Sequence, residues 1–230
     1  MSHHREFGRY APSYERYRLI QARVAASLAS TIKKSYSHVV DLGCGSGGFF
    51  RAYERPFTKY FAIDLSPEML ALHPDGEGVE KWLGDFNDPS LYERLKKEPV
   101  DLVISASSLQ WSEDLDATLA SIASLEAPVA LAIFTAGTFR TLHEIAGVPS
   151  PIRDARKTVA ALRRHFDLQI DILKYELYFK DPLSMLRYIK RSGVSGGRRR
   201  LGVGALKKVM ARYPHAYLEF EVVRAVSAGI

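Results

Sequence analysis

The chain has 230 residues, of which 47% are hydrophobic and 25% charged, values typical of a globular protein and not of a disordered or fibrous one. Its most apolar stretch, residues 129–134, is far shorter than the roughly 20 residues that a membrane-spanning helix needs. The N-terminus lacks the apolar run of a signal peptide, and the single cysteine, Cys44, excludes an intrachain disulfide and a multi-cysteine metal site. We therefore expect a cytoplasmic protein.

The net charge of +6 is distributed unevenly along the chain. Residues 180–230 contain eleven Lys or Arg against three Asp or Glu, a local charge of +8, so the preceding residues together carry −2. The positive charge centres on Arg198, Arg199 and Arg200 and on Lys207 and Lys208. This pattern indicates either a surface that binds an acidic partner or an ordinary solvated helix face and loop.

The predicted elements up to residue 134 alternate between helices and short strands. In chain order they are an amphipathic helix over 13–34, a strand at 38–42 followed by a glycine turn and the start of a helix, a strand at 60–64, a helix beginning at 66–68, a helix at 89–98, and strands at 100–105 and 129–134. This alternation predicts parallel β-α-β units in a doubly wound sheet.

After residue 135 the alternation becomes looser. The pattern there predicts a helix at 157–165, a strand at 168–180, helices at 182–191 and 203–213 on either side of a Gly/Arg-rich loop, and a final strand at 216–226. We divide one predicted domain, 1–230, into an N-terminal helical cover at 1–34, a core at 35–134 and a C-terminal elaboration at 135–230.

A glycine-rich loop follows the first predicted strand. Its glycines, Gly43, Gly45, Gly47 and Gly48, satisfy both G-x-G-x-G and the dinucleotide pattern G-x-G-x-x-G. In either case glycine lets the backbone turn sharply and approach a nucleotide in space that a Cβ would fill. Asp41, two residues before the first glycine, would repel a diphosphate, so it favours a cationic ligand over a nicotinamide dinucleotide.

Two further acidic residues lie where the next strands are expected to end. Asp64 closes the second strand and is placed to accept hydrogen bonds from ribose hydroxyls. Asp85, before Phe86, can accept from an adenine amine, although a turn or helix-capping aspartate is an alternative interpretation. S-adenosylmethionine carries an α-ammonium and a sulfonium and no phosphate, so it fits the whole series. We expect Cys44 within the loop to be a small inert side chain and not a nucleophile, because the sequence indicates no histidine partner for it.

The loop and the acidic series resemble those of class I S-adenosylmethionine-dependent methyltransferases over about residues 39–134. A narrower resemblance to the malonyl-acyl-carrier-protein O-methyltransferases of biotin synthesis spans most of the chain. It rests on Phe7-Gly8-Arg9 with Ala11, Tyr14 and Gln21, on Leu109-Gln110-Trp111, on Phe134-Thr135 with Gly137-Thr138-Phe139 and Leu142-His143-Glu144, and on Phe179-Lys180-Asp181 with Leu186-Arg187 and Ile189-Lys190.

This resemblance implies a mostly parallel, seven-stranded Rossmann-like sheet and methyl transfer to a malonyl carboxylate, with no metal. The residues that it implies for the cofactor are Asp41, Gly43, Gly45, Gly47, Asp64, Leu65, Asp85, Phe86, Ser105 and Gln21. On the substrate side it implies Tyr14, Gln110 and Trp111 near the acceptor and Arg187 as a clamp for its carboxylate. The alternative interpretation of Tyr14 and Trp111 is ordinary packing against the sheet, and that of Arg187 is an ordinary exposed arginine on a helix.

The resemblance also implies acyl carrier protein as the partner, docked on Arg198, Arg199, Arg200, Lys207 and Lys208. Two other functions remain open. Carboxyl methyltransferases of the trans-aconitate type share the core and part of the Leu-Gln-Trp region. A pI near 9.3 suggests a nucleic-acid methyltransferase or binding protein. Residues 105–108 lack the Asn/Asp-Pro-Pro-aromatic tetrad of base-amino methyltransferases, so we do not expect nucleic-acid binding. The shortness of the apolar stretches leads us to expect no membrane binding either.

Overall fold

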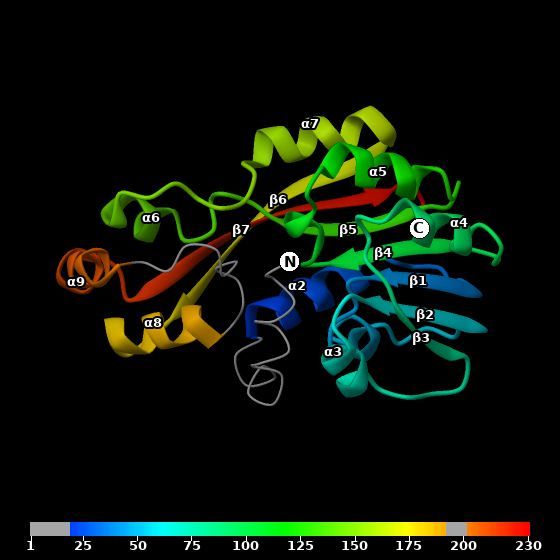
Figure 1. The fold of residues 1–230 in the computed structure, drawn as a ribbon, viewed down its shortest axis with the longest axis horizontal. Coiled ribbons are helices and arrows are strands. Elements are labelled where there is room, and N and C mark those ends of the chain that lie inside the picture. The colour runs from blue at the N-terminus through cyan, green and yellow to red at the C-terminus, as the bar shows by residue number, and fades with distance from the viewer. Residues whose placement is uncertain (1–18, 192–201) are drawn as a thin grey trace.

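The computed structural model describes residues 19–191 and 202–230, and these form one twisted sheet with helices on both faces (Figure 1). The strand order is β3-β2-β1-β4-β5-β7-β6. The parallel strands are β1 (His38–Leu42), β2 (Lys59–Asp64), β3 (Val79–Leu83), β4 (Leu102–Ala106) and β5 (Val129–Phe134). β6 (Leu168–Tyr178) and β7 (Tyr217–Ser227) add an antiparallel edge. The predicted fold class is confirmed.

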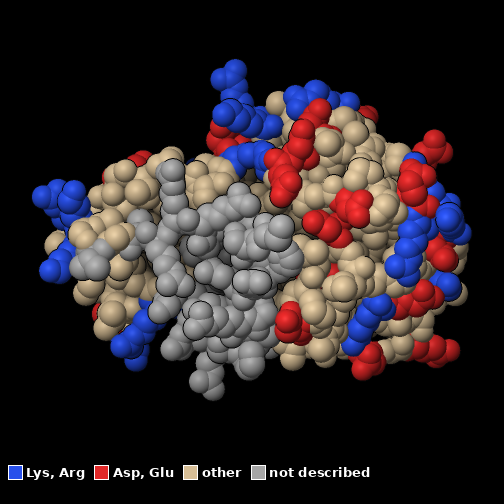
Figure 2. All heavy atoms as spheres, viewed as in Figure 1, with Lys and Arg blue, Asp and Glu red and all other residues tan. Residues whose placement is uncertain are grey.

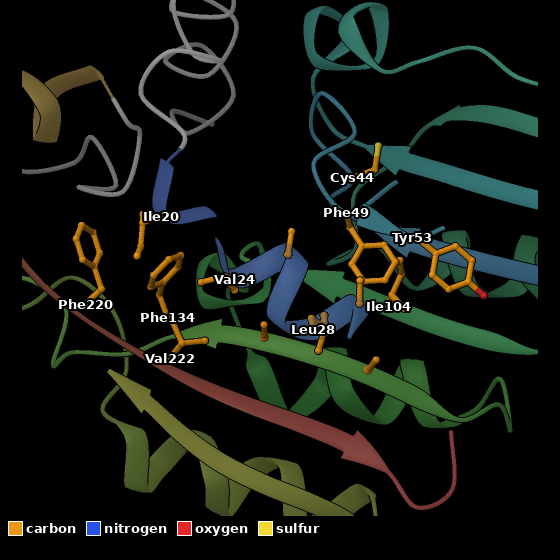
Figure 3. Packing of buried hydrophobic residues seen from close by; sticks show 14 of the residues in the cluster. Ile20, Val24, Leu28, Cys44, Phe49, Tyr53, Ile104, Phe134, Phe220 and Val222 are labelled. Atoms are coloured by element: carbon orange, nitrogen blue, oxygen red, sulfur yellow. The ribbon is translucent and has the colours of Figure 1, made fainter. Parts of the chain in front are cut away.

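The two faces of the sheet bury different helices. On one face, α2 (Leu19–Ala29) inserts Ile20, Val24 and Leu28 against residues such as Phe134 and Val222 (Figure 3). α3 (Pro67–Leu72) contributes to the same layer. The opposite face is covered by α4 (Pro89–Leu95), α5 (Leu115–Ala123) and α7 (Ala155–His165). Side chains alternate between these layers along each strand, as the two-residue repeat of a strand requires.

The antiparallel pair of β6 and β7 extends past the parallel strands. β5 pairs with β7 only from Ala130 to Phe134, whereas β6 pairs with β7 along its full length. Because β7 runs antiparallel to β5, residues 217–221 project beyond the carboxyl end of β5. α6 (Arg140–Ala146), α8 (Pro182–Arg191) and α9 (Val203–Arg212) lie on this projecting part (Figure 1). The projection therefore forms a wall on the side of the sheet where parallel strands end.

Apolar packing and hydrogen bonds hold the wall together. Tyr188 of α8 packs edge-on against Phe220 of β7, with ring centroids 6.3 Å apart. The segment after β5 is held to β7 by Thr135, whose hydroxyl donates to Glu221 Oε1 at 2.5 Å, and by the Phe139 amide, which donates to the Glu219 carbonyl at 2.9 Å. These contacts tie the wall to the core sheet.

Several predicted boundaries were wrong. The helix predicted to run to Lys34 ends at Ala29, because polar side chains from 30–33 fold back onto the last carbonyls of the helix; the Thr31 hydroxyl, for example, donates to the Leu28 carbonyl. The helix predicted after the glycine loop is only the short 3-10 helix η2, Phe50–Ala52. α5 and α6 were not predicted, although Asp114 caps α5 by accepting from two backbone amides.

Candidate active site

A cavity opens at the carboxyl ends of β1 and β4, between the glycine loop and α2. Its position agrees with the rule that parallel sheets bind ligands beyond the carboxyl ends of their strands. The residues that line it are Gln21, Ala22, Ala25, Asp41, Gly43, Cys44, Gly45, Ser46, Gly48, Phe49, Ala106 and Ser107. The cavity thus brings together four of the predicted cofactor residues, namely Gln21, Asp41, Gly43 and Gly45.

The glycine loop is held by the carboxylate of Asp64 at the end of β2. Asp64 Oδ2 accepts from the Gly45 amide at 2.8 Å, and Oδ1 accepts from the Ser66 amide at 2.9 Å. A carboxylate has about four acceptor sites, so these bonds leave it able to accept from ribose hydroxyls as well. Asp64 is half-buried and lies outside the cavity lining. Leu65, next in sequence, is also half-buried.

The three glycines of the loop have different requirements. Gly43, Gly45 and Gly47 all have positive φ. A Cβ on Gly43 would lie 2.4 Å from Ser108, and one on Gly47 would lie 2.5 Å from Pro74, so the packing of the protein itself requires glycine at both positions. Gly43 also lines the cavity, and the role of both glycines toward a cofactor stays a prediction. A Cβ on Gly45 would meet no described atom within 4 Å, so the space beside Gly45 is open among the described residues.

Asp41 is buried, 1% exposed, on the face of β1 that looks toward α2. Its Oδ2 accepts from the Tyr60 hydroxyl at 2.7 Å, while no described residue offers a hydrogen bond to Oδ1. Burial raises the pKa of the carboxyl to about 7; the Tyr60 bond lowers it and the nearby charge of Asp64 raises it. Such a group favours a cation, because a positive charge would satisfy Oδ1 and stabilise the ionised form.

Asp85 and Phe86 follow β3, as predicted. Asp85 Oδ1 accepts from the backbone amide and the side-chain amide of Asn87, both at 2.8 Å. This is the turn geometry that formed the alternative interpretation, and its role toward adenine stays a prediction. The Phe86 ring lies near the glycine loop, 3.7 Å from a Cβ built on Gly43, although Phe86 is not in the cavity lining.

Of three residues predicted at the end of β4, Ser105 and Gln110 form hydrogen bonds within the described chain. Ser105 is fully buried, and its hydroxyl donates to the Leu42 carbonyl at 2.8 Å, which joins β4 to β1. Gln110 is buried and bonds to the Ser107 carbonyl. Trp111 is half-buried in the 3-10 helix η3, Leu109–Trp111. Their side chains lie outside the cavity lining, which includes Ala106 and Ser107 instead.

Of the predicted substrate and partner residues, Arg187, Lys207 and Lys208 are described by the structure and are not among the residues that line the cavity. Arg187 is exposed on α8, on the wall, and Lys207 and Lys208 are exposed on α9. Figure 2 shows Lys and Arg side chains at the end of the molecule that α9 forms in Figure 1. Tyr14 and the Arg198–Arg200 cluster lie outside the described residues.

Sequence reasoning missed Ser107 and two alanines of α2. Ala22 and Ala25 leave room beside Asp41, and their small size at helical spacing next to Gln21 was the available signal. Burial raises the pKa of the Cys44 thiol, with the carboxylates of Asp41 and Asp64 adding to the effect, which agrees with an inert side chain.

Residues 19–191 and 202–230 contain no group of three or more His, Cys, Asp or Glu side chains placed to hold a metal ion. No helix in this part of the chain has the length and apolar character needed to cross a membrane.

The site fits S-adenosylmethionine in two respects. The cavity contains a buried acceptor, Asp41 Oδ1, that receives no hydrogen bond from residues 19–191 or 202–230, and no atom of these residues fills the space beside Gly45. The seven-stranded sheet and this site define a class I S-adenosylmethionine-dependent methyltransferase. The model of the methyltransferase domain family matches residues 40–134.

Comparisons with known proteins support the same class. The chain is 30% identical to the malonyl-[acyl-carrier protein] O-methyltransferase of Chlorobium luteolum, over 95% of this chain and 88% of that protein. It is 26% identical to the enzyme of the same name from Porphyromonas gingivalis, over 90% and 83%. It belongs to the family of these malonyl-[acyl-carrier protein] O-methyltransferases. A solved S-adenosylmethionine-dependent methyltransferase of Thermotoga maritima has the same fold, with a TM-score of 0.58 at 15% identity and coverage of 97% and 99%.

Proposed function

We propose that the enzyme transfers a methyl group to the free carboxylate of a malonyl thioester carried by acyl carrier protein, giving the methyl ester that starts the pimeloyl chain of biotin. The main support is the relationship to proteins of that name over nearly the whole chain. The described site adds that the ligand pocket holds a buried acidic group suited to a cationic methyl donor.

The proposed reaction needs no general base. A carboxylic acid has a pKa near 4, so the acceptor is already ionised at pH 7. Bound S-adenosylmethionine would supply an electrophilic methyl group on a sulfonium centre. The acceptor carboxylate oxygen would form the new bond to that methyl carbon, and the electron pair of the broken carbon–sulfur bond would stay on sulfur. Because opposite charges neutralise each other in this transition state, alignment and exclusion of water become the main contributions of the protein.

The residues of the site divide these tasks in the proposed complex. Asp41 binds the ammonium group of the donor, Asp64 accepts from its ribose hydroxyls, and Asp85 with Phe86 contacts the adenine. The buried Tyr60 hydroxyl fixes the orientation of the Asp41 carboxylate. Tyr14 and the other residues of the N-terminal cover would exclude water; Tyr14 itself lies outside the described residues.

Arg187 is our candidate for holding the acceptor carboxylate. A guanidinium can grip a carboxylate through two parallel hydrogen bonds. α8, which carries Arg187, is anchored to the wall through the buried side chains of Met185, Tyr188 and Ile189. That anchoring leaves Arg187 exposed on the opposite side of the helix, where an incoming acyl group can reach it.

The carrier protein would dock on the wall. Acyl carrier proteins are acidic, and Lys207 and Lys208 on α9 present positive charge there. Reversal of both lysines to Glu should raise the KM for malonyl-carrier-protein and reduce its salt dependence, because exposed charges act mainly on encounter and are screened over about 8 Å at physiological salt. The matched control reverses Arg156 and Arg163, two exposed arginines on α7, and should leave that KM unchanged.

The deciding experiment is mass spectrometry of malonyl-acyl-carrier-protein incubated with the enzyme and S-adenosylmethionine. We expect the mass of one added methyl group on the malonyl arm and none on acetyl-carrier-protein, which lacks the free carboxylate. Methylation of trans-aconitate with no change in malonyl-carrier-protein would assign the enzyme to the other type of carboxyl methyltransferase. Tight NAD binding without binding of S-adenosylhomocysteine would reject the cofactor as well.

A further inference from the structure

Ser107, the first residue after β4, has an unusual backbone conformation. Its φ is +70°, in the left-handed region that residues with a Cβ rarely adopt. Such conformations concentrate at ligand sites, and they persist where the surroundings hold them in place. Ser107 also lines the cavity that contains Asp41. The combination makes it a candidate for a ligand contact.

Neighbouring groups fix this conformation from two sides. The Ser107 amide donates to the Ala132 carbonyl of β5 at 2.9 Å. The Ser107 carbonyl accepts from Gln110 Nε2 at 2.6 Å, and Gln110 Oε1 in turn accepts from the Phe134 amide at 3.4 Å. The buried Gln110 side chain therefore spans from the β4 turn to the end of β5 and holds Ser107 in place. Gln110 thereby acts through Ser107 as a positioning residue.

The Ser107 hydroxyl differs from the two serine hydroxyls beside it. The Ser105 and Ser108 hydroxyls lie 2.6 Å from each other and 2.8 Å from the Leu42 carbonyl, so both have hydrogen-bond partners within this group of three oxygens. The Ser107 Oγ is buried, and none of the described residues lies within hydrogen-bond distance of it. A buried polar atom without a partner is unfavourable, so a partner is expected from the ligand.

Asp41 and Ser107 thus give one cavity two buried polar atoms that have no hydrogen-bond partner among the described residues. Asp41 Oδ1 on a carboxylate can only accept, whereas a serine hydroxyl can donate. An α-amino acid group presents the matching pair, an ammonium that donates and a carboxylate that accepts. The cavity is therefore complementary to the amino-acid end of the methyl donor.

We propose that the Ser107 hydroxyl donates a hydrogen bond to the α-carboxylate of S-adenosylmethionine while Asp41 binds the adjacent ammonium group. This inference rests on the proposed placement of the cofactor and does not depend on the identity of the methyl acceptor. In the donor, two methylene groups join the α-carbon to the sulfur, so fixing both charged groups restricts where the methyl group points. Ser107 is thus a positioning residue for the transfer.

The test compares two ligands by calorimetry, S-adenosylhomocysteine and its decarboxylated analogue, which keeps the amine and lacks the carboxylate. Ser107→Ala should weaken S-adenosylhomocysteine by about tenfold, as expected for loss of a hydrogen bond to a charged acceptor, and leave the analogue unchanged. Asp41→Asn should weaken both ligands, because both contain the ammonium group. Loss confined to the carboxylate-bearing ligand is the expected signature of Ser107.

Ser107→Gly separates ligand binding from stability. It removes the hydroxyl and also the Cβ that disfavours positive φ, so it should melt above Ser107→Ala while binding S-adenosylhomocysteine equally weakly. Equal affinity of the wild type and Ser107→Ala for S-adenosylhomocysteine would overturn the inference, as would equal losses for both ligands. An unchanged affinity with a raised KM for the malonyl substrate would assign the hydroxyl to the acceptor instead. Wild-type binding of S-adenosylhomocysteine without methylation of malonyl-carrier-protein would overturn only the proposed acceptor.

Discussion

Replacement of Asp41 by Asn should make the ligand-free protein more stable at alkaline pH, although it weakens cofactor binding. The carboxyl is fully buried, and its environment raises the pKa from 3.8 to about 7. Between these values the folded protein retains a proton that the unfolded chain has released. Stability therefore falls as pH rises through this window, and the loss is complete above pH 7. Asn is nearly isosteric and does not ionise, so Asp41→Asn lacks this penalty.

The magnitude follows from the two pKa values. At about 1.4 kcal/mol for each pKa unit, the full penalty is about 4 kcal/mol, and about 2.5 kcal/mol of it develops between pH 5 and pH 8. The free energy of unfolding of Asp41→Asn minus that of the wild type should increase by this amount across that range. The free energy of unfolding of Tyr60→Phe minus that of the wild type should instead decrease as pH rises, because this substitution removes the hydrogen bond that lowers the pKa of Asp41.

Urea denaturation followed by circular dichroism at several pH values measures this difference. The subtraction cancels the titration of every group that the two proteins share, and a pH-independent packing cost of Asn shifts the difference without altering its slope. Parallel stability profiles between pH 5 and pH 8 would refute the argument. With ligand present, the wild-type affinity for S-adenosylhomocysteine should rise as pH increases toward 7, because the ionised carboxylate is the form that binds an ammonium.

Two other substitutions separate folding from function. Gly45→Ala places a Cβ in open space at φ +55°, so it should cost only about 1–2 kcal/mol of stability but reduce S-adenosylhomocysteine affinity by more than tenfold. Gly47→Ala should cost more stability, because its Cβ would meet a proline side chain at 2.5 Å. Equal effects of the two substitutions on the urea midpoint and on the calorimetric affinity would contradict this assignment. Arg187→Ala should lower kcat/KM for malonyl-carrier-protein by at least about tenfold, while stability changes by less than about 0.5 kcal/mol and S-adenosylhomocysteine affinity stays unchanged. The control Arg163→Ala should leave kcat/KM, stability and affinity unaltered. Near-normal turnover of Arg187→Ala would assign the carboxylate clamp to another cationic residue.

The parts of the site that depend on local sequence could be predicted. A β-branched run followed by closely spaced glycines places Asp41 at the end of a strand, and apolar runs located β2, β4 and β5. The bounds of β3 were not predicted, because its sequence, Val-Glu-Lys-Trp-Leu, is not an apolar run. The strand repeat also puts Asp41 on the same face as Val39, which packs in the α2 layer. These features rest on spacing within one segment, which the chain shows directly.

Features that depend on contacts between distant segments could not be predicted. Tyr60 reaches Asp41 because β2 pairs with β1 in a register that sets Asp41 opposite Ala62. The left-handed conformation of Ser107 depends on Ala132 and Gln110, and nothing in the sequence Ser-Ala-Ser-Ser indicates it. The clearance required at glycine loop positions likewise comes from side chains that lie far along the chain.

The long antiparallel pair β6–β7 is anchored where residues 222–226 of β7 pair with β5, and its other end bears α8 and α9. That outer end is braced as well, because Glu221 and Glu219 of β7 bond to Thr135 and Phe139 in the segment that follows β5. A shift of the outer end would therefore be passed to this segment and to Phe134, whose amide bonds to Gln110. Gln110 in turn bonds to the Ser107 carbonyl, so the position of α8 and α9 is connected mechanically to the backbone that lines the cavity.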